Sequence, residues 1–147
     1  ILCDAITRVL IKFLSRFKPT VKFRKFGTEF EIDEGLLAED EEEIRGQLNE
    51  YFSGTREAFE LKVSFPDGFT GRVMREMSKI PYGETKTYGE IAEALDSSAV
   101  AVGYACGSNR VPVIVPCHRV VGKTSSDGYM YGREVKKKLL DMERGRL

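Results

Sequence analysis

The sequence predicts an α+β fold in which a part of mixed strands and helices precedes a mostly helical part. Apolar and polar side chains alternate within residues 23–32 and again within 59–65, which is the period of a strand. After residue 66 apolar side chains recur mainly at helical spacing. Pro66-Asp67-Gly68 separates the two patterns with strong turn formers, so we expect an N-terminal domain over residues 1–65 and a C-terminal domain over 66–147.

The N-terminal domain is expected to contain helices and short strands. It opens with four apolar residues at helical spacing: Ile6, Val9, Leu10 and Phe13. One or two strands follow between residues 23 and 32. Residues 39–52 begin with carboxylates, which favour the positive end of a helix dipole, and then become periodic, so they predict a helix that ends at Ser53-Gly54. The alternation over 59–65 predicts another strand.

The C-terminal domain is expected to carry a helix-turn-helix. A helix over 70–80 comes first and ends at Pro81-Tyr82-Gly83. The next helix spans 87–95 and begins with a capping-box pattern, in which Thr87 is followed three residues later by Glu90. A polar turn and a second helix over 99–108 complete the motif.

A last periodic helix is expected over residues 134–143.

The second helix of this motif has no charged residue, since none occurs from Ser97 to Asn109. Major-groove readers normally project arginine, asparagine or glutamine toward base edges. Ala99, Gly103 and Gly107 recur four residues apart and form a smooth strip. Two interpretations remain open: the strip packs inside the protein, or it approaches a minor groove closely with an apolar side chain as a wedge.

Charge distribution, the cysteine and histidine counts and the length of the apolar runs exclude several classes of protein. The 23 basic and 23 acidic residues cancel, but residues 1–65 hold 10 basic and 13 acidic side chains. Residues 66–147 therefore carry the positive excess, and we expect a polyanion to bind to them. Three scattered cysteines and one histidine match neither a disulfide framework nor a zinc pattern, so we expect no metal and a reducing compartment: cytoplasmic, or nuclear in a eukaryote. No apolar run approaches the ~20 residues of a membrane span.

The most informative segment spans residues 113–121. It contains Cys117 directly followed by His118, the single histidine, with β-branched residues on both sides. These runs predict a buried, strand-like segment. A cysteine reacts as its thiolate, and a nearby imidazole can take its proton directly or through a water. The alternative is that Cys117 is a small core residue.

Three segments together resemble the O6-alkylguanine-DNA alkyltransferases, which transfer an alkyl group from guanine to their own cysteine. Residues 80–92 are similar to the entry of that family's helix-turn-helix, 101–109 to its recognition helix and asparagine hinge, and 116–120 to its Pro-Cys-His-Arg signature. The resemblance implies a ribonuclease H-like N-terminal domain with a small antiparallel sheet and a winged-helix-like C-terminal domain. It also implies a single-turnover DNA repair protein that needs no cofactor.

The resemblance assigns the chemistry to three residues. Cys117 would be the nucleophile, His118 the base that acts through a water, and Glu143 the carboxylate that orients the imidazole. The partner would be double-stranded DNA containing O6-alkylguanine, bound through its minor groove by a monomer, with the target base flipped out of the stack.

Further residues would hold the flipped base. Tyr88 would donate a hydrogen bond to the guanine and crowd the backbone phosphate, and Asn109 would tie the recognition helix to the active-site segment. The carbonyl groups of Cys117 and Val120 would accept the guanine amino group, and Ala99 and Gly103 would face the DNA.

Two positions depart from the family pattern. Val100 stands where the family usually carries an arginine that fills the gap left by the flipped base, and Ala99 stands where proline is common. Met130 stands where a serine usually offers its backbone N–H to the guanine oxygen, a role that methionine can keep.

Three other classes of protein share parts of this pattern. A lesion-binding relative without transfer would lack Cys117. A helix-turn-helix regulator would need charged or amide side chains on its second helix. A thiol hydrolase would release its product and regenerate the thiol, so turnover distinguishes it.

Overall fold

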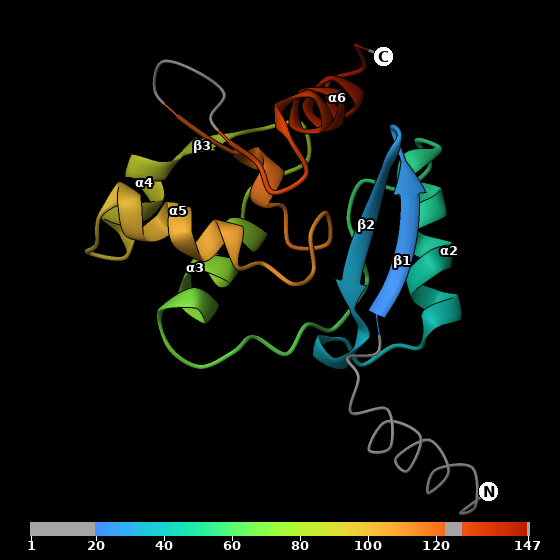
Figure 1. Cartoon of the computed structure of the whole chain (residues 1–147), viewed down its shortest axis with the longest axis horizontal. Coiled ribbons are helices and arrows are strands. Elements are labelled where there is room, and N and C mark those ends of the chain that lie inside the picture. The colour runs from blue at the N-terminus through green and yellow to red at the C-terminus, as the bar shows by residue number, and fades with distance from the viewer. Residues whose placement is uncertain (1–19, 123–127, 147) are drawn as a thin grey trace, which may run out of the picture.

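The computed structural model describes residues 20–122 and 128–146, and the fold is α+β as predicted. The helix expected around Ile6 to Phe13 lies outside the described residues. Figure 1 shows a hairpin and the helix packed on it on one side of the molecule and a group of helices on the other, with α6 (Arg133–Glu143) between them at one end. No helix within the described ranges has the length and apolarity needed to cross a membrane.

An antiparallel hairpin of β1 (Thr20–Lys25) and β2 (Thr28–Asp33) begins the described chain. Phe26 and Gly27 form its turn, and both have positive φ, at 55° and 71°. A two-residue turn of this kind matches the twist of the strands it joins. One or two strands are predicted between residues 23 and 32, and the structure has two, with the turn between them.

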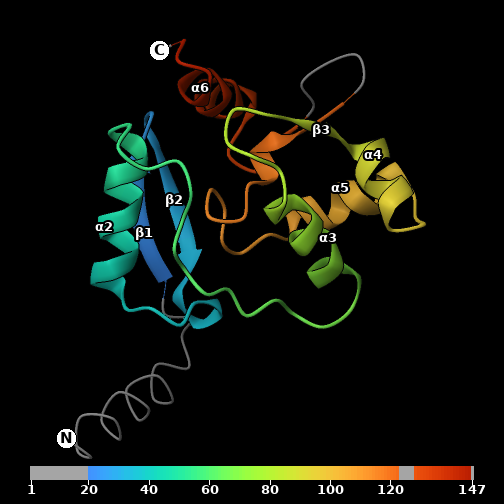
Figure 2. The same ribbon diagram turned by 180° about the vertical axis from the view of Figure 1, so that it is seen from behind.

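Helix α2 (Glu41–Phe52) covers one face of the hairpin, as Figure 2 shows from behind. The side chain of Asp40 caps it by accepting a backbone N–H from its first turn. Phe52 stacks on Phe23 with ring centroids 5.2 Å apart. The helix buries three large residues of its inner face: Ile44, Leu48 and Tyr51.

The strand expected over 59–65 is wrong. Only Val63 pairs, in an isolated bridge with Leu37. Upstream, the Gln47 side chain takes the place of a neighbouring strand: its Oε1 accepts from the N–H of Glu60 at 2.8 Å and its Nε2 donates to the Glu60 carbonyl at 3.2 Å. Because a side chain satisfies these backbone groups, they need no strand partner.

Three helices build the other side: α3 (Phe69–Ser78), α4 (Tyr88–Ala94) and α5 (Ala99–Gly107). The predicted capping box at the start of α4 is present, with Thr87 and Glu90 each accepting the other's backbone N–H. A short turn leads into α5, so the predicted helix-turn-helix is confirmed.

The segment 113–121 is buried as predicted, but it is mostly not a strand. Val113 has a φ of 71° within a turn, the 3-10 helix η2 (Cys117–Arg119) follows, and only β4 (Val120–Val121) is extended. This strand pairs in parallel with β3 (Lys86–Thr87). A local turn closed by the N–H of Val115 and the carbonyl of Val111 at 2.9 Å replaces the expected ladder.

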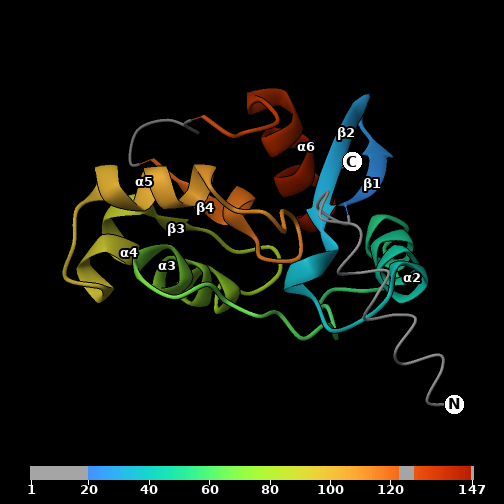
Figure 3. The ribbon, with the colours of Figure 1, turned by 60° about the horizontal axis from the view of Figure 1, so that its bottom comes forward.

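The two sides of the molecule are joined through the hairpin. Figure 3 shows α6 beside β2. The Tyr131 ring lies 4.8 Å from that of Phe30, and its hydroxyl accepts the N–H of Glu31 at 3.0 Å. The N–H of Asp33 donates to the carbonyl of Arg110 at 2.9 Å.

Replacing glycine by alanine should change the free energy of unfolding in opposite directions at two positions within helices. A Cβ at Gly71 would lie 1.7 Å from the Pro66 carbonyl oxygen, whereas a Cβ at Gly46 in α2 meets nothing within 4 Å. Gly71→Ala should destabilise the protein by about 1–3 kcal/mol, because backbone must move. Gly46→Ala should stabilise it by roughly 0.5–1 kcal/mol. Urea denaturation of both variants checks the pair, and a neutral Gly71→Ala would contradict this packing.

Candidate active site

Cys117 lies at the first position of η2, where its thiol lines a cavity of about 210 Å³. Three residues predicted from the sequence share this cavity: Tyr88, Gly103 and Met130. The remaining lining residues are Cys106, Gly107, Gly128 and Tyr129. The cavity therefore joins the start of α4, the small-residue face of α5 and the loop before α6.

Burial raises the pKa of the Cys117 thiol to about 11. Hydrogen bonding from the Asn109 side chain and the positive charge of Lys136 act in the opposite direction and lower that pKa. The Tyr129 side chain lowers it as well. The thiol is consequently protonated near neutral pH and needs a base before it can act as a nucleophile.

His118, which follows Cys117 in the chain, is a fully buried imidazole. Burial lowers the pKa of its imidazole, so the ring is neutral near pH 7. Its Nε2 lies 2.7 Å from Oε2 of Glu143, and beside a carboxylate this nitrogen carries the ring proton. Nδ1 is then the unprotonated nitrogen; it is buried and bonds to none of the described residues. The geometry leaves one lone pair to take a proton.

Glu143, at the end of α6, is a buried carboxylate that accepts hydrogen bonds from three directions. Besides His118, Arg119 donates from Nε to Oε1 at 2.8 Å and from Nη2 to Oε2 at 2.9 Å. The Tyr51 hydroxyl donates to Oε2 and the N–H of Gly83 to Oε1. Burial alone raises the pKa of Glu143, but hydrogen bonds from His118 and Arg119 outweigh it, so the pKa lies well below its ordinary value.

Sequence reasoning missed Arg119 and Tyr51 as parts of this network. From the sequence, Arg119 is only one residue of the Pro-Cys-His-Arg signature, and Tyr51 is one of the periodic residues of the helix over 39–52. A signal for Arg119 was available, because a charged residue within an apolar, buried segment needs a partner of opposite charge. No signal connected Tyr51 to Glu143, since the two lie 92 residues apart.

Lys136 was also missed. Its side chain is fully buried, its Nζ donates to the Val120 carbonyl at 2.6 Å, and it lies 5.6 Å from the centroid of the Tyr88 ring. It precedes Glu143 by seven residues, which places both on the same face of α6. That spacing was the available signal.

Asn109 connects α5 to the segment that carries the thiol. Its Nδ2 donates to the Val115 carbonyl at 2.9 Å and its Oδ1 accepts from the N–H of Val111 at 3.0 Å. Both bonds are buried, so they fix the turn that leads into η2.

The face of α5 formed by Ala99, Gly103 and Gly107 does not pack inside the protein. Ala99 and Gly107 are exposed, and Gly103 is partly exposed. Val100, the position of the missing arginine, has 71 % of its surface exposed. Neither Ala99 nor Val100 lines the cavity of Cys117, so the structure places them beside the pocket rather than in it.

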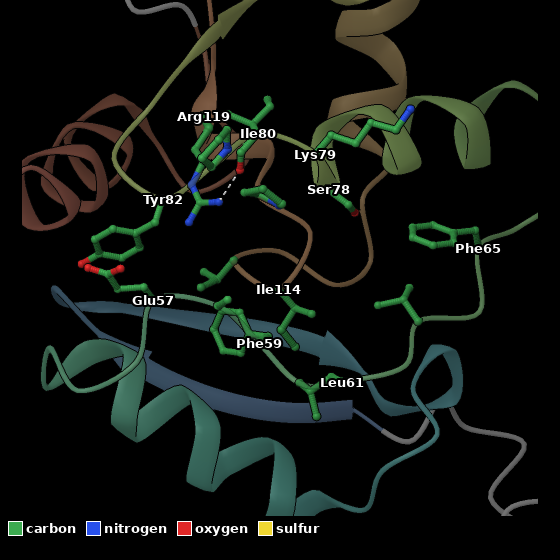
Figure 4. A pocket seen from close by; sticks show the side chains of 15 residues that line it. Glu57, Phe59, Leu61, Phe65, Ser78, Lys79, Ile80, Tyr82, Ile114 and Arg119 are labelled. Carbon is green, nitrogen blue, oxygen red and sulfur yellow. Dashed lines mark hydrogen bonds between the residues drawn. The ribbon is translucent and has the colours of Figure 1, made fainter.

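A larger cavity, of about 620 Å³, lies away from the thiol between the chain around Phe59 and the turn after α3 (Figure 4). Arg119 borders it and donates from Nη1 to the Ile80 carbonyl at 2.8 Å. Neither Cys117 nor His118 lines this cavity. Within residues 20–122 and 128–146 no cluster of histidine, cysteine and acidic residues could hold a metal ion.

Comparisons with known proteins agree on one family. Residues 68–145 match the model of the 6-O-methylguanine DNA methyltransferase DNA-binding domain. A methylated-DNA–protein-cysteine methyltransferase of Archaeoglobus fulgidus is 44 % identical over 110 residues, covering 69 % of this chain and 74 % of the relative. One from Methanosarcina acetivorans is 38 % identical over 130 residues, covering 84 % and 83 %.

Solved structures give the same result. The Mycobacterium tuberculosis O6-methylguanine methyltransferase matches with a TM-score of 0.67 and 40 % identity over 73 % of this chain and 67 % of that one. The OGT protein of the same organism in complex with DNA matches with a TM-score of 0.68 and 40 % identity over 72 % and 68 %.

Replacing the central carboxylate should destabilise the fold. Glu143→Gln leaves the buried Arg119 without its anionic partner, and breaking a buried ion pair in this way costs about 3–5 kcal/mol. Glu134→Gln is the matched control, because Glu134 lies on the same helix and is exposed; it should change the free energy of unfolding by less than about 0.5 kcal/mol. Chemical denaturation at pH 7 measures both, and equal effects would contradict the network.

The same comparison has an expected pH dependence. The pKa of Glu143 is lower in the folded protein than its ordinary value of 4.5, so its stabilising effect is present above that value and is lost as the pH falls through the folded-state pKa. The stability difference between the wild type and Glu143→Gln should therefore shrink on acidification below about pH 4.5. If the stability difference instead grew on acidification, the ionised Glu143 carboxylate would be destabilising the fold, contrary to this prediction.

Proposed function

Because the chain belongs to the methylated-DNA–protein-cysteine methyltransferase family, we propose that Cys117 is the residue that accepts the alkyl group. The protein repairs O6-alkylguanine in DNA by transferring the alkyl group to its own cysteine. The observation that supports Cys117 is its position: it lines a cavity beside the small-residue face of α5, next to a neutral imidazole held by a buried carboxylate.

The transfer is proposed to proceed as one displacement. Nδ1 of His118 takes the thiol proton through a water, and the imidazolium that forms is stabilised by Glu143. The sulfur then attacks the alkyl carbon, so that a C–S bond forms and the bond from that carbon to O6 breaks with its electron pair moving to guanine. Tyr88, at the cavity, donates a hydrogen bond to the departing guanine. The thioether is stable, so each molecule reacts once.

The base pocket and the DNA face are assigned to further residues. The carbonyl groups of Cys117 and Val120 accept the guanine amino group, and the hydrogen bond from Lys136 fixes the position of the Val120 carbonyl. The backbone N–H of Met130, in the loop that lines the cavity, donates a hydrogen bond to the guanine oxygen. The exposed face of α5, with Ala99 and its glycines, enters the minor groove of duplex DNA, bound by a monomer.

The domain division and the compartment are proposals of the same kind. Residues 66–147 would carry the DNA-binding and reactive groups, and residues 1–65 would support them through the Tyr51 hydroxyl. Three cysteines without a disulfide framework favour a reducing compartment, the cytoplasm or a nucleus.

Reaction with an oligonucleotide that contains O6-methylguanine should place one methyl group on Cys117. Intact mass followed by peptide mapping locates the adduct. Cys106 is the internal control: it lines the same cavity, but burial raises the pKa of its thiol to about 12, and the thiol donates to the sulfur of Met77. Cys117→Ser should abolish the reaction, whereas an adduct chiefly on Cys106 would overturn the assignment.

A charge on the small-residue face of α5 should prevent duplex binding. A Cβ at Gly103 meets no atom within 4 Å, so Gly103→Glu is compatible with the fold but places an anion against DNA. We expect the affinity for duplex DNA to fall more than about tenfold, because like charges brought together cost several kcal/mol. Gly46→Glu, an equally open glycine on α2, should bind as the wild type does. Fluorescence anisotropy measures both, and equal binding by both variants would move the interface elsewhere.

A further inference from the structure

The outward face of α5 carries two exposed apolar side chains one turn apart. Val100 is 71 % exposed and Tyr104 is 78 % exposed. The opposite face of the helix packs into the core through Val102, Ala105 and Cys106. The Tyr104 side chain makes no hydrogen bond within the described part of the chain. Because it is also exposed, the ring contributes little to the stability of the fold.

This face is continuous with the pocket of the reactive thiol. A shallow hollow of about 450 Å³ is lined by Val100, Gly103, Tyr104, Gly107 and Ser108. Gly103 and Gly107 also line the cavity of Cys117. The two depressions therefore share a wall that carries no side chain, and a flat ring can pass across this wall at van der Waals distance from the helix backbone.

The chemistry of the face favours stacking over hydrogen bonding. No charged side chain occurs from Ser97 to Asn109, so no guanidinium or ammonium of this helix can bond to an orphaned base. Valine at position 100 is branched and short and has no π-face. The phenol ring of Tyr104 is planar and can stack on any base, because every base presents a π-face.

We propose that Tyr104 is the side chain that enters the base stack of the duplex when the alkylated guanine leaves it. The inference rests on the proposed function, since it concerns how the same site obtains its base. Stacking of the ring on the bases that flank the vacated position stabilises the extruded state, while Val100 packs beside it against the groove. Tyr104 is thus a positioning residue for duplex substrates.

The test compares the rate of alkyl transfer from duplex DNA with that from the free base O6-benzylguanine, which needs no extrusion. Tyr104→Ala and Tyr104→Leu should lower the ratio of the duplex rate to the free-base rate roughly 5- to 150-fold, the range of base–aromatic stacking. Tyr104→Phe keeps the ring and should keep the ratio within about twofold of the wild type. Thermal unfolding should be nearly unchanged, since the side chain is exposed.

Val100→Ala is the matched control, because it truncates the neighbouring exposed apolar side chain. It should lower the ratio less than Tyr104→Ala does. An equal or larger loss would assign the wedge to Val100 instead, and an unchanged ratio in Tyr104→Ala would overturn the proposal. A loss in Tyr104→Phe as large as in Tyr104→Ala would also overturn it, because the hydroxyl rather than the ring would then be responsible.

A readout without alkyl transfer separates this proposal from the proposed function. In a Cys117→Ser background, 2-aminopurine placed at the position of the alkylated guanine should brighten when binding draws it out of the stack with Tyr104 present, and stay quenched with Tyr104→Ala. Equal brightening in both would refute a role for the ring. Failure of the proposed function has a different signature: the wild type would transfer no alkyl group from either substrate, whatever the fluorescence shows.

Discussion

The buried carboxylate of Glu143 is the interaction on which the rest of the site depends. Five donor atoms converge on its two oxygens, from α2 through Tyr51, from the turn after α3 through Gly83, and from η2 through His118 and Arg119. A buried charge is costly unless its partners satisfy it. Here the partners come from segments far apart in the chain, so one carboxylate both joins the two sides of the molecule and fixes the imidazole next to the thiol.

Burial and charge balance each other around the sulfur. Burial holds the pKa of the Cys117 thiol at about 11, which keeps it protonated and protects it from indiscriminate reaction. The cation of Lys136 and the amide of Asn109 lower that pKa, so the cost of forming the thiolate is moderated. The neutral His118 is the remaining element, and burial lowers the pKa of its imidazole far enough to leave it a free base near pH 7.

The inner face of α5 packs into the core, whereas its outer face is open to a second molecule. Its inner face fills the space against α3, where Cys106 contacts Met77. Its outer face is nearly without side chains at Ala99, Gly103 and Gly107, which permits close approach of a second molecule. The outer face of this helix therefore offers a smooth surface with few side chains that could make base-specific contacts.

Local patterns in the sequence determined most of the helices, because caps and periodicity act over a few residues. The capping box of Thr87 and the acidic start of α2 are examples. The signature around Cys117 likewise indicated the family and its chemistry. Both failed strand predictions, over 59–65 and 113–121, arose where polar side chains, Gln47 and Asn109, satisfy backbone groups that a strand neighbour would otherwise bind.

Only the tertiary structure decided which charges are buried and what they contact. Tyr51 and Glu143 lie 92 residues apart and His118 and Glu143 lie 25 apart, so no local pattern relates them. Likewise, the outward exposure of Val100 and Tyr104 follows from which side of α5 packs on α3. An all-apolar helix does not specify its buried side by its own sequence, because either face could pack, and the choice is made by the neighbours it meets in the fold.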